Sequence, residues 1–399
     1  MPTVTDDALA VSIEKRLRDR NPIFRDFFAR EAPRLAATCR EMSQRFLQGG
    51  RLLAFGRSSY ATDAQHVSVE FVHPVIVGKR ALPALDLSPC FRPWLEAIMR
   101  PEDMVMGFGP PKGDADVTAA LDWAGARGAM TFALPGVAGS RASYAVVDAA
   151  ADPFVSQELI ELLYHTLWET VHVFFEHRQL GHDAGASAFL YPFLGGAPHE
   201  APDLLGDVAT SIVMKVADDA ELRARVADEE SDRIAEAVVA IARRLDRGGK
   251  IILFGNGGSA TDANDWALDL VDPPSGCHAI PAISLAMEPA NVTAIANDIG
   301  TDVIFVRQLI AHAQPDDVAI AISTSGGSRN VIAALAEARK RQLLTVALLG
   351  YDGGEIKRGA LADHFVVVHS DYIPRIQEVQ ASIYHVMCEC LEGQVRGDI

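Results

Sequence analysis

Short, unbroken apolar runs recur along the chain and are separated by longer amphipathic stretches. The clearest are LLAFG (52–56), IILFG (251–255), VAIAIS (318–323) and LLTVALLG (343–350). Continuous apolar runs of this length are typical of parallel strands that are buried on both faces. Because these runs alternate with helical patterns, we predict a doubly wound α/β fold with a mainly parallel sheet.

The chain reads as two copies of one such unit. GGRLLAFGRSSYATDA (49–64) parallels GGKIILFGNGGSATDA (248–263), and QELIELLYH (157–165) parallels QEVQASIYH (377–385). The first copy is shorter in its middle, where it lacks a counterpart of residues 289–305. An internal repeat of this size predicts two domains. We place them at 1–180 and 204–399, joined by a linker at 181–203 that is rich in Gly, Ala and Pro.

Composition narrows the class of protein. The net charge of −17 argues against non-specific binding of nucleic acid. The sequence has no run of about 18 apolar residues, so we predict no membrane span. Its first residues lack the basic and then apolar layout of a signal peptide. The five cysteines are scattered and odd in number. We therefore expect reduced thiols that pack in the core of a cytoplasmic protein.

Two polar loops follow predicted strands and precede helices. The first, Gly255–Ser259, contains three glycines, which allow positive φ angles and close approach to the backbone. The second, Ser323–Ser328, offers four hydroxyl groups beside two glycines. Hydroxyl and backbone N–H groups at the start of a helix suit a phosphate, although a plain turn would also account for either loop. The glycine spacing fits neither a dinucleotide loop nor a P-loop, so we expect a sugar phosphate.

The motifs GNGGSATDA, ANDIG, ISTSGGSRNVIAAL and RIQE, with a later histidine, carry a family resemblance. They resemble the sugar isomerase (SIS) domain, and more narrowly phosphoheptose isomerase, over nearly all of 205–395. Residues 30–178 resemble a degenerate SIS domain. The resemblance implies two three-layer α/β/α sandwiches of flavodoxin-like type and a bound sugar phosphate. It implies that the substrate is held by Asn256, Gly257, Gly258, Ser259, Asp298, Ser323, Thr324, Ser325, Ser328 and Gln377.

The resemblance also assigns four metal-binding or acid–base positions to each copy. In the first copy these are His66, Glu70, Gln157 and His165, which keep the family's residue types and imply a zinc site. In the second copy they are Asp265, Asp269, Gln377 and His385. Independently of the family, His66 and Glu70 are spaced i, i+4 and so share a helix face. Imidazole, carboxylate and amide groups suit a zinc-like ion. A buried polar cluster between helices is the alternative.

Two functions remain open at this point. Aldose–ketose isomerisation through an enediol needs a base and an acid, which Asp269 and His385 could supply. Alternatively, Glu70 and His165 supply the chemistry while the second copy binds the phosphate. The rival function is a non-catalytic sugar-phosphate sensor or adaptor, which the change to two Asp residues favours.

Two further expectations concern assembly and surface residues. The resemblance implies a homodimer that forms a pseudo-tetramer of SIS domains. We expect the histidine run after the first copy, at 172, 177 and 182, to be exposed.

Overall fold

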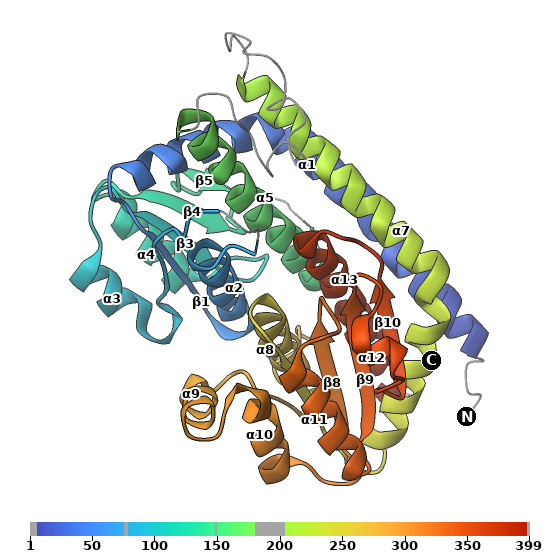
Figure 1. The fold of residues 1–399 in the computed structure, drawn as a ribbon. Helices are drawn as coiled ribbons and strands as arrows, with labels where there is room; N and C mark the ends of the chain where they lie inside the picture. The colour runs from blue at the N-terminus through green and yellow to red at the C-terminus, as the bar shows by residue number, and fades with distance from the viewer. Residues whose placement is uncertain (1–5, 76–78, 148–149, 180–203, 397–399) are drawn as a thin grey trace. The chain divides into compact units, whose positions relative to one another are not determined.

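The computed structural model describes residues 6–75, 79–147, 150–179 and 204–396, and it contains two five-stranded sheets (Figure 1). The elements up to residue 179 are α1 (Asp6–Leu47), β1 (Leu52–Gly56), η1 (Ser58–Tyr60), α2 (Ala61–Val72), β2 (Ala84–Asp86), η2 (Ser88–Cys90), α3 (Phe91–Ile98), β3 (Met104–Phe108), α4 (Ala115–Gly125), β4 (Met130–Leu134), β5 (Tyr144–Ala145) and α5 (Pro153–Gln179). The later elements are α7 (Leu204–Leu245), β6 (Ile251–Gly255), α8 (Gly258–Val271), β7 (Ala282–Ser284), α9 (Pro289–Asp298), η4 (Thr301–Val303), α10 (Ile304–His312), β8 (Val318–Ser323), α11 (Arg329–Lys340), β9 (Leu344–Gly350), α12 (Gly354–Arg358), β10 (His364–Val368) and α13 (Ile373–Arg396).

The two sheets have the same strand order. The first is β2-β1-β3-β4-β5, and the second, read from its β7 edge, is β7-β6-β8-β9-β10. The strand pairs are parallel throughout. This is the order of flavodoxin-like folds, in which ligands bind beyond the carboxyl ends of the strands.

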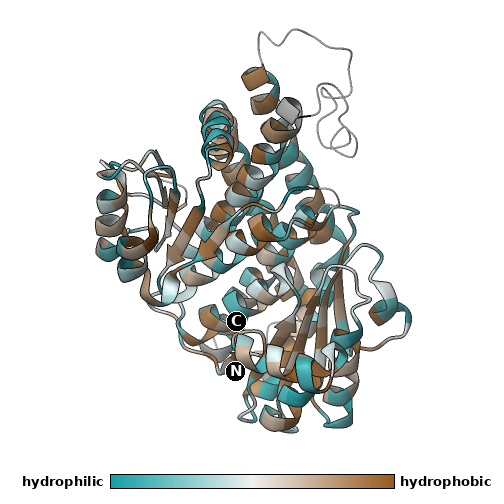
Figure 2. Ribbon diagram, turned by 60° about the vertical axis from the view of Figure 1, so that its left-hand side comes forward, coloured by the Kyte–Doolittle hydropathy of each residue, from teal (hydrophilic) through white to brown (hydrophobic). Residues whose placement is uncertain are grey.

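Side chains of the central strand β1 enter two different layers. In β1, Leu52 and Ala54 belong to a core shared with α1, α2 and α5. Leu53 and Phe55 belong to the opposite core, which they share with α3 and α4. Figure 2 shows the strands mostly in brown, flanked by helices that alternate between brown and teal. The predicted three-layer sandwich with a parallel sheet is confirmed.

The chain divides into two compact units. One is Pro22–Ala220, here called the N-terminal unit, and the other is Met1–Asn21 with Glu221–Ile399, called the C-terminal unit. These differ from the expected ranges 1–180 and 204–399, because α1 and α7 each contribute one part to each unit. The expected linker at 181–203 lies outside the described residues.

Side-chain contacts within each unit account for the division of α1 and α7. In the N-terminal unit, Val208 and Ile212 of α7 join the same core as Phe24 and Phe28 of α1. In the C-terminal unit, the side chain of Arg223 donates to Asn21 Oδ1 over 2.9 Å. A helix belongs to the unit against which its side chains pack, and sequence order does not reveal this.

None of the described helices has an apolar stretch long enough to cross a membrane.

Candidate functional site: a buried histidine–carboxylate cluster in each unit

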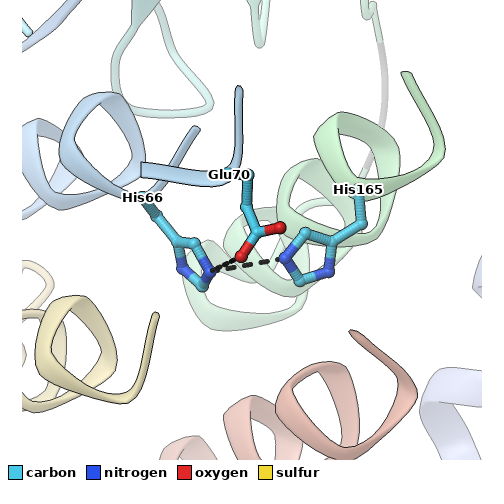
Figure 3. Close-up of side chains that lie close together, drawn as sticks. All are labelled: His66, Glu70 and His165. Atoms are coloured by element: carbon cyan, nitrogen blue, oxygen red, sulfur yellow. Dashed lines mark hydrogen bonds and ion pairs between the residues drawn. The ribbon is translucent and has the colours of Figure 1, made fainter. Parts of the chain in front are cut away.

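The N-terminal unit brings His66, Glu70 and His165 together (Figure 3). His66 and Glu70 lie one turn apart on α2, and His165 points toward them from α5. The Nε2 atoms of the two histidines are 3.4 Å apart, and His66 Nε2 is 3.9 Å from Glu70 Oε1. The three side chains are at most 3% exposed. The predicted i, i+4 pair therefore faces a second imidazole in the core.

This donor set is suited to zinc. Burial, and then the neighbouring His165, lower the pKa of His66 well below its usual range, so its imidazole is neutral at neutral pH. A neutral imidazole binds metal, and catalytic zinc sites use two histidines with one carboxylate. One atom from each of the three side chains lies within 4.8 Å of the others. Gln157 is buried near the start of α5, and its role as a fourth ligand stays a prediction.

The C-terminal unit contains a second cluster at the corresponding positions. Asp265 and Asp269 lie on α8, and His385 lies on α13. His385 Nε2 is 3.2 Å from Asp269 Oδ2 and 3.8 Å from Asp265 Oδ2. All three residues are at most 6% exposed. A carboxylate in hydrogen-bond contact with an imidazole is an arrangement that can accept and donate protons.

Tyr384 is a member of this cluster that sequence reasoning missed. Its hydroxyl donates to Asp265 Oδ2 over 2.8 Å, and its ring stacks on Trp266 with the centroids 5.4 Å apart. The Tyr-His pair occurs in both copies, at 164–165 and at 384–385. This repetition beside the predicted histidines is the sequence signal that could have identified Tyr384.

The glycine loop of the C-terminal unit forms a tight turn between β6 and α8. Gly257 has a φ of +57°, and α8 begins at the next residue. Asn256 and Asn330 exchange two hydrogen bonds of 2.9 Å through their side-chain amides. Since Asn330 follows the Ser/Thr loop on α11, these bonds join the two predicted phosphate loops.

The Ser/Thr loop is held in shape by its own hydroxyls. Ser323 Oγ accepts from the N–H of Gly326, and Ser325 Oγ accepts from the N–H of Gly327, both over 3.2 Å. Gly326 has a φ of +58°, and a Cβ there would lie 2.2 Å from the carbonyl oxygen of Gly353. The loop leads into the N-terminus of the 12-residue helix α11. Loops of this kind are suited to anions.

Two other predicted substrate contacts occupy different environments. Asp298 is the exposed last residue of α9 and accepts from Asn297 Nδ2 over 2.8 Å. Gln377 is 2% exposed, and its Oε1 has no hydrogen-bond partner within the described part of the chain. A buried amide oxygen of this kind is an acceptor that a bound ligand can use.

One surface prediction is wrong. We expected His172 to be exposed, but it is 2% exposed, and its ring nitrogens lie 2.9 Å from the carbonyl oxygens of Trp168 and Arg80. The carbonyl that faces the ring N–H accepts its hydrogen bond, which gives the buried donor a partner. The side chains at 177 and 182 lie outside the part that the structure describes.

The fold and the two clusters define a protein with two α/β/α units, each with a parallel sheet and a buried imidazole–carboxylate group. A family model described as SIS domain matches residues 216–350. The phosphoheptose isomerase of Alteromonas mediterranea is 43% identical over 171 residues, which cover 41% of this chain and 84% of that protein. The phosphoheptose isomerase of Sulfurimonas denitrificans is 45% identical over 169 residues, which cover 41% of this chain and 84% of that protein. The chain therefore belongs to the sugar isomerase (SIS) domain family.

A solved structure extends the likeness to both units. The C-terminal domain of glucosamine-fructose-6-phosphate aminotransferase from Francisella tularensis has a TM-score of 0.60 and 8% sequence identity. The match covers 92% of this chain and 94% of that one. It shows a shared fold.

Proposed function

We propose that this protein is an aldose–ketose isomerase that acts on a phosphorylated heptose, as phosphoheptose isomerases do by name. The observation that carries the proposal is the 3.2 Å contact between His385 Nε2 and Asp269 Oδ2. This buried contact occurs in the unit that also has the glycine loop and the Ser/Thr loop.

In this reaction the Ser/Thr loop binds the phosphate through Ser323, Thr324, Ser325 and Ser328. Asp269 removes a proton from the carbon next to the carbonyl, and His385 donates a proton to the carbonyl oxygen, which gives an enediol. Asp269 then returns a proton to the former carbonyl carbon, and His385 takes a proton from the hydroxyl on the neighbouring carbon, which completes the isomerisation and restores both groups. Tyr384 fixes Asp265 beside this pair through its hydrogen bond.

The proposal includes zinc in the N-terminal unit, bound by His66, Glu70, His165 and Gln157. The donor set and spacing of the first three support it. Bound zinc would act as a Lewis acid toward an oxygen of a ligand. We also propose a homodimer and a cytoplasmic location.

Incubation of the full chain with sedoheptulose 7-phosphate tests the proposal. We expect an aldose 7-phosphate to accumulate, as measured by NMR. Saturable binding without conversion would contradict an isomerase and would support the second candidate, a sugar-phosphate sensor or adaptor. The replacement of the family's His and Glu by Asp265 and Asp269 is the observation that favours this candidate.

A further inference from the structure

The N-terminal unit has an open pocket of its own, with a volume of about 610 Å³. It lies beyond the carboxyl ends of β1 and β2, between the turn that follows β1 and the segment Ser88–Pro93. Its walls include Arg57, Ser58, Gln65, Cys90, Phe91 and Arg92. None of these residues belongs to the His66–Glu70–His165 cluster.

The pocket lies where the connection between β2 and β3 is shorter than the corresponding connection in the C-terminal unit. In the N-terminal unit residues 87–103 join β2 to β3, whereas in the C-terminal unit residues 285–317 join β7 to β8 and include α9 and α10. Phe254 of β6 packs against Phe305 of α10 with centroids 5.4 Å apart. The corresponding Phe55 stacks on Phe91, the first residue of α3, at 4.4 Å. Phe91 thus covers the strand and also forms part of the pocket wall.

The turn after β1 has a positive φ angle although a serine replaces the glycine of the C-terminal unit. Gly257 in the C-terminal unit has a φ of +57°, and Ser58 at the corresponding position has a φ of +53°. A residue with a Cβ is unfavourable in this left-handed conformation. Strained turns of this kind persist where the surrounding structure or a function requires them. The serine therefore keeps the turn and adds a hydroxyl to the pocket wall.

The polar groups of the wall suit an anion that carries hydroxyl groups. Arg57 forms ion pairs with Asp114 and Asp116, and its side chain is 49% exposed. Arg92 pairs with the exposed Glu96. Ion pairs this exposed are weak and can be exchanged for a phosphate, to which an arginine can donate two parallel hydrogen bonds. Ser58, Gln65 and Asp116 offer partners for sugar hydroxyls.

We propose that this pocket is a second sugar-phosphate site, separate from the Ser323–Ser328 loop. Arg57 and Arg92 bind the phosphate, and the polar side chains around them bind the sugar. The site does not depend on catalysis in the C-terminal unit. It would make the chain a protein with two ligand sites of different chemistry, one built from hydroxyls and one from arginines.

Cys90 provides a direct test, because it is exposed and lines the pocket. Cys277 is also exposed and belongs to the C-terminal unit, so it serves as an internal control. We would measure alkylation of both thiols of the full chain by mass spectrometry, with and without sedoheptulose 7-phosphate. At about ten times the dissociation constant of the site, Cys90 should react about tenfold more slowly, because only about one site in ten remains empty. Cys277 should react at an unchanged rate.

Variants locate the protection. Protection of Cys90 should be lost in Arg57→Ala/Arg92→Ala and in Ala61→Phe, which fills the pocket without changing its charge. It should persist in Arg141→Ala, a matched control whose side chain is 78% exposed and pairs with Asp122. Protection should also persist in Ser325→Ala, which changes only the loop that binds phosphate in the proposed function. The two proposals can therefore fail independently of one another.

Three results would overturn the inference. One is an unchanged Cys90 rate at saturating sedoheptulose 7-phosphate. Another is protection that survives in both pocket variants. The third is equal protection by inorganic phosphate at the same concentration, which would indicate general anion binding.

Discussion

Replacing Asp269 by Asn removes the proposed base with little change of shape. Asp269 Oδ2 lies 3.2 Å from His385 Nε2, and the two side chains are 3% and 0% exposed. An amide of the same size cannot accept the substrate proton. Loss of a positioned general base lowers the rate by about 10²- to 10⁴-fold, which corresponds to about 2.7–5.4 kcal/mol of activation free energy. The KM should change little, because the Ser/Thr loop is untouched.

The assay is the initial rate of aldose 7-phosphate formation from sedoheptulose 7-phosphate. Asp272→Asn is the matched control, because Asp272 is exposed and caps the end of the same helix, α8. Its rate should equal that of the wild type. The reasoning is refuted if Asp269→Asn is as active as this control. If Glu70→Gln then loses activity instead, the chemistry belongs to the N-terminal cluster.

Three further predictions address the other parts of the account. His165→Ala should abolish the binding of about one zinc ion per chain, measured by elemental analysis, since only one imidazole would remain among the proposed ligands. Retention of zinc would contradict the site. Asp265→Asn is its control and should keep that ion. Ser325→Ala should raise the KM about 10- to 100-fold through the loss of a hydrogen bond to a charged phosphate, and an unchanged KM would place the phosphate elsewhere. Gly326→Ala should lower the free energy of unfolding, measured in urea, by about 1–3 kcal/mol, because it adds a side chain at a residue with positive φ. The added Cβ would also lie 2.2 Å from the carbonyl oxygen of Gly353. An unchanged free energy of unfolding would refute the tight packing of the loop.

The central strands could be predicted from the sequence, and the edge strands could not. Residues 52–56, 251–255 and 318–322 are apolar, and they lie in β1, β6 and β8 as predicted. The edge strands β2 and β5 have three and two residues, which is too short for any periodic pattern. The division of α1 and α7 between units depends on tertiary packing, so the repeat alone could not reveal it.

The site could be anticipated in part. The spacing of His66 and Glu70 predicts one helix face, and the family resemblance supplied the partner His165 on a distant helix. The hydrogen bond from Tyr384 to Asp265 depends on how α8 and α13 pack. The burial of His172 likewise depends on carbonyl groups, one of them at Arg80, far away in sequence. Such contacts between distant segments are set by packing and not by local pattern.

The most direct test of the central claim is deuterium incorporation into sedoheptulose 7-phosphate by the wild-type chain in D₂O, followed by NMR. Enediol chemistry exchanges the proton on the carbon next to the carbonyl, even when net conversion is small. The account predicts deuterium at that carbon and in the aldose 7-phosphate, at a rate that falls sharply in Asp269→Asn. Bound but unlabelled sugar phosphate, with no product, would contradict the claim that this protein is an isomerase.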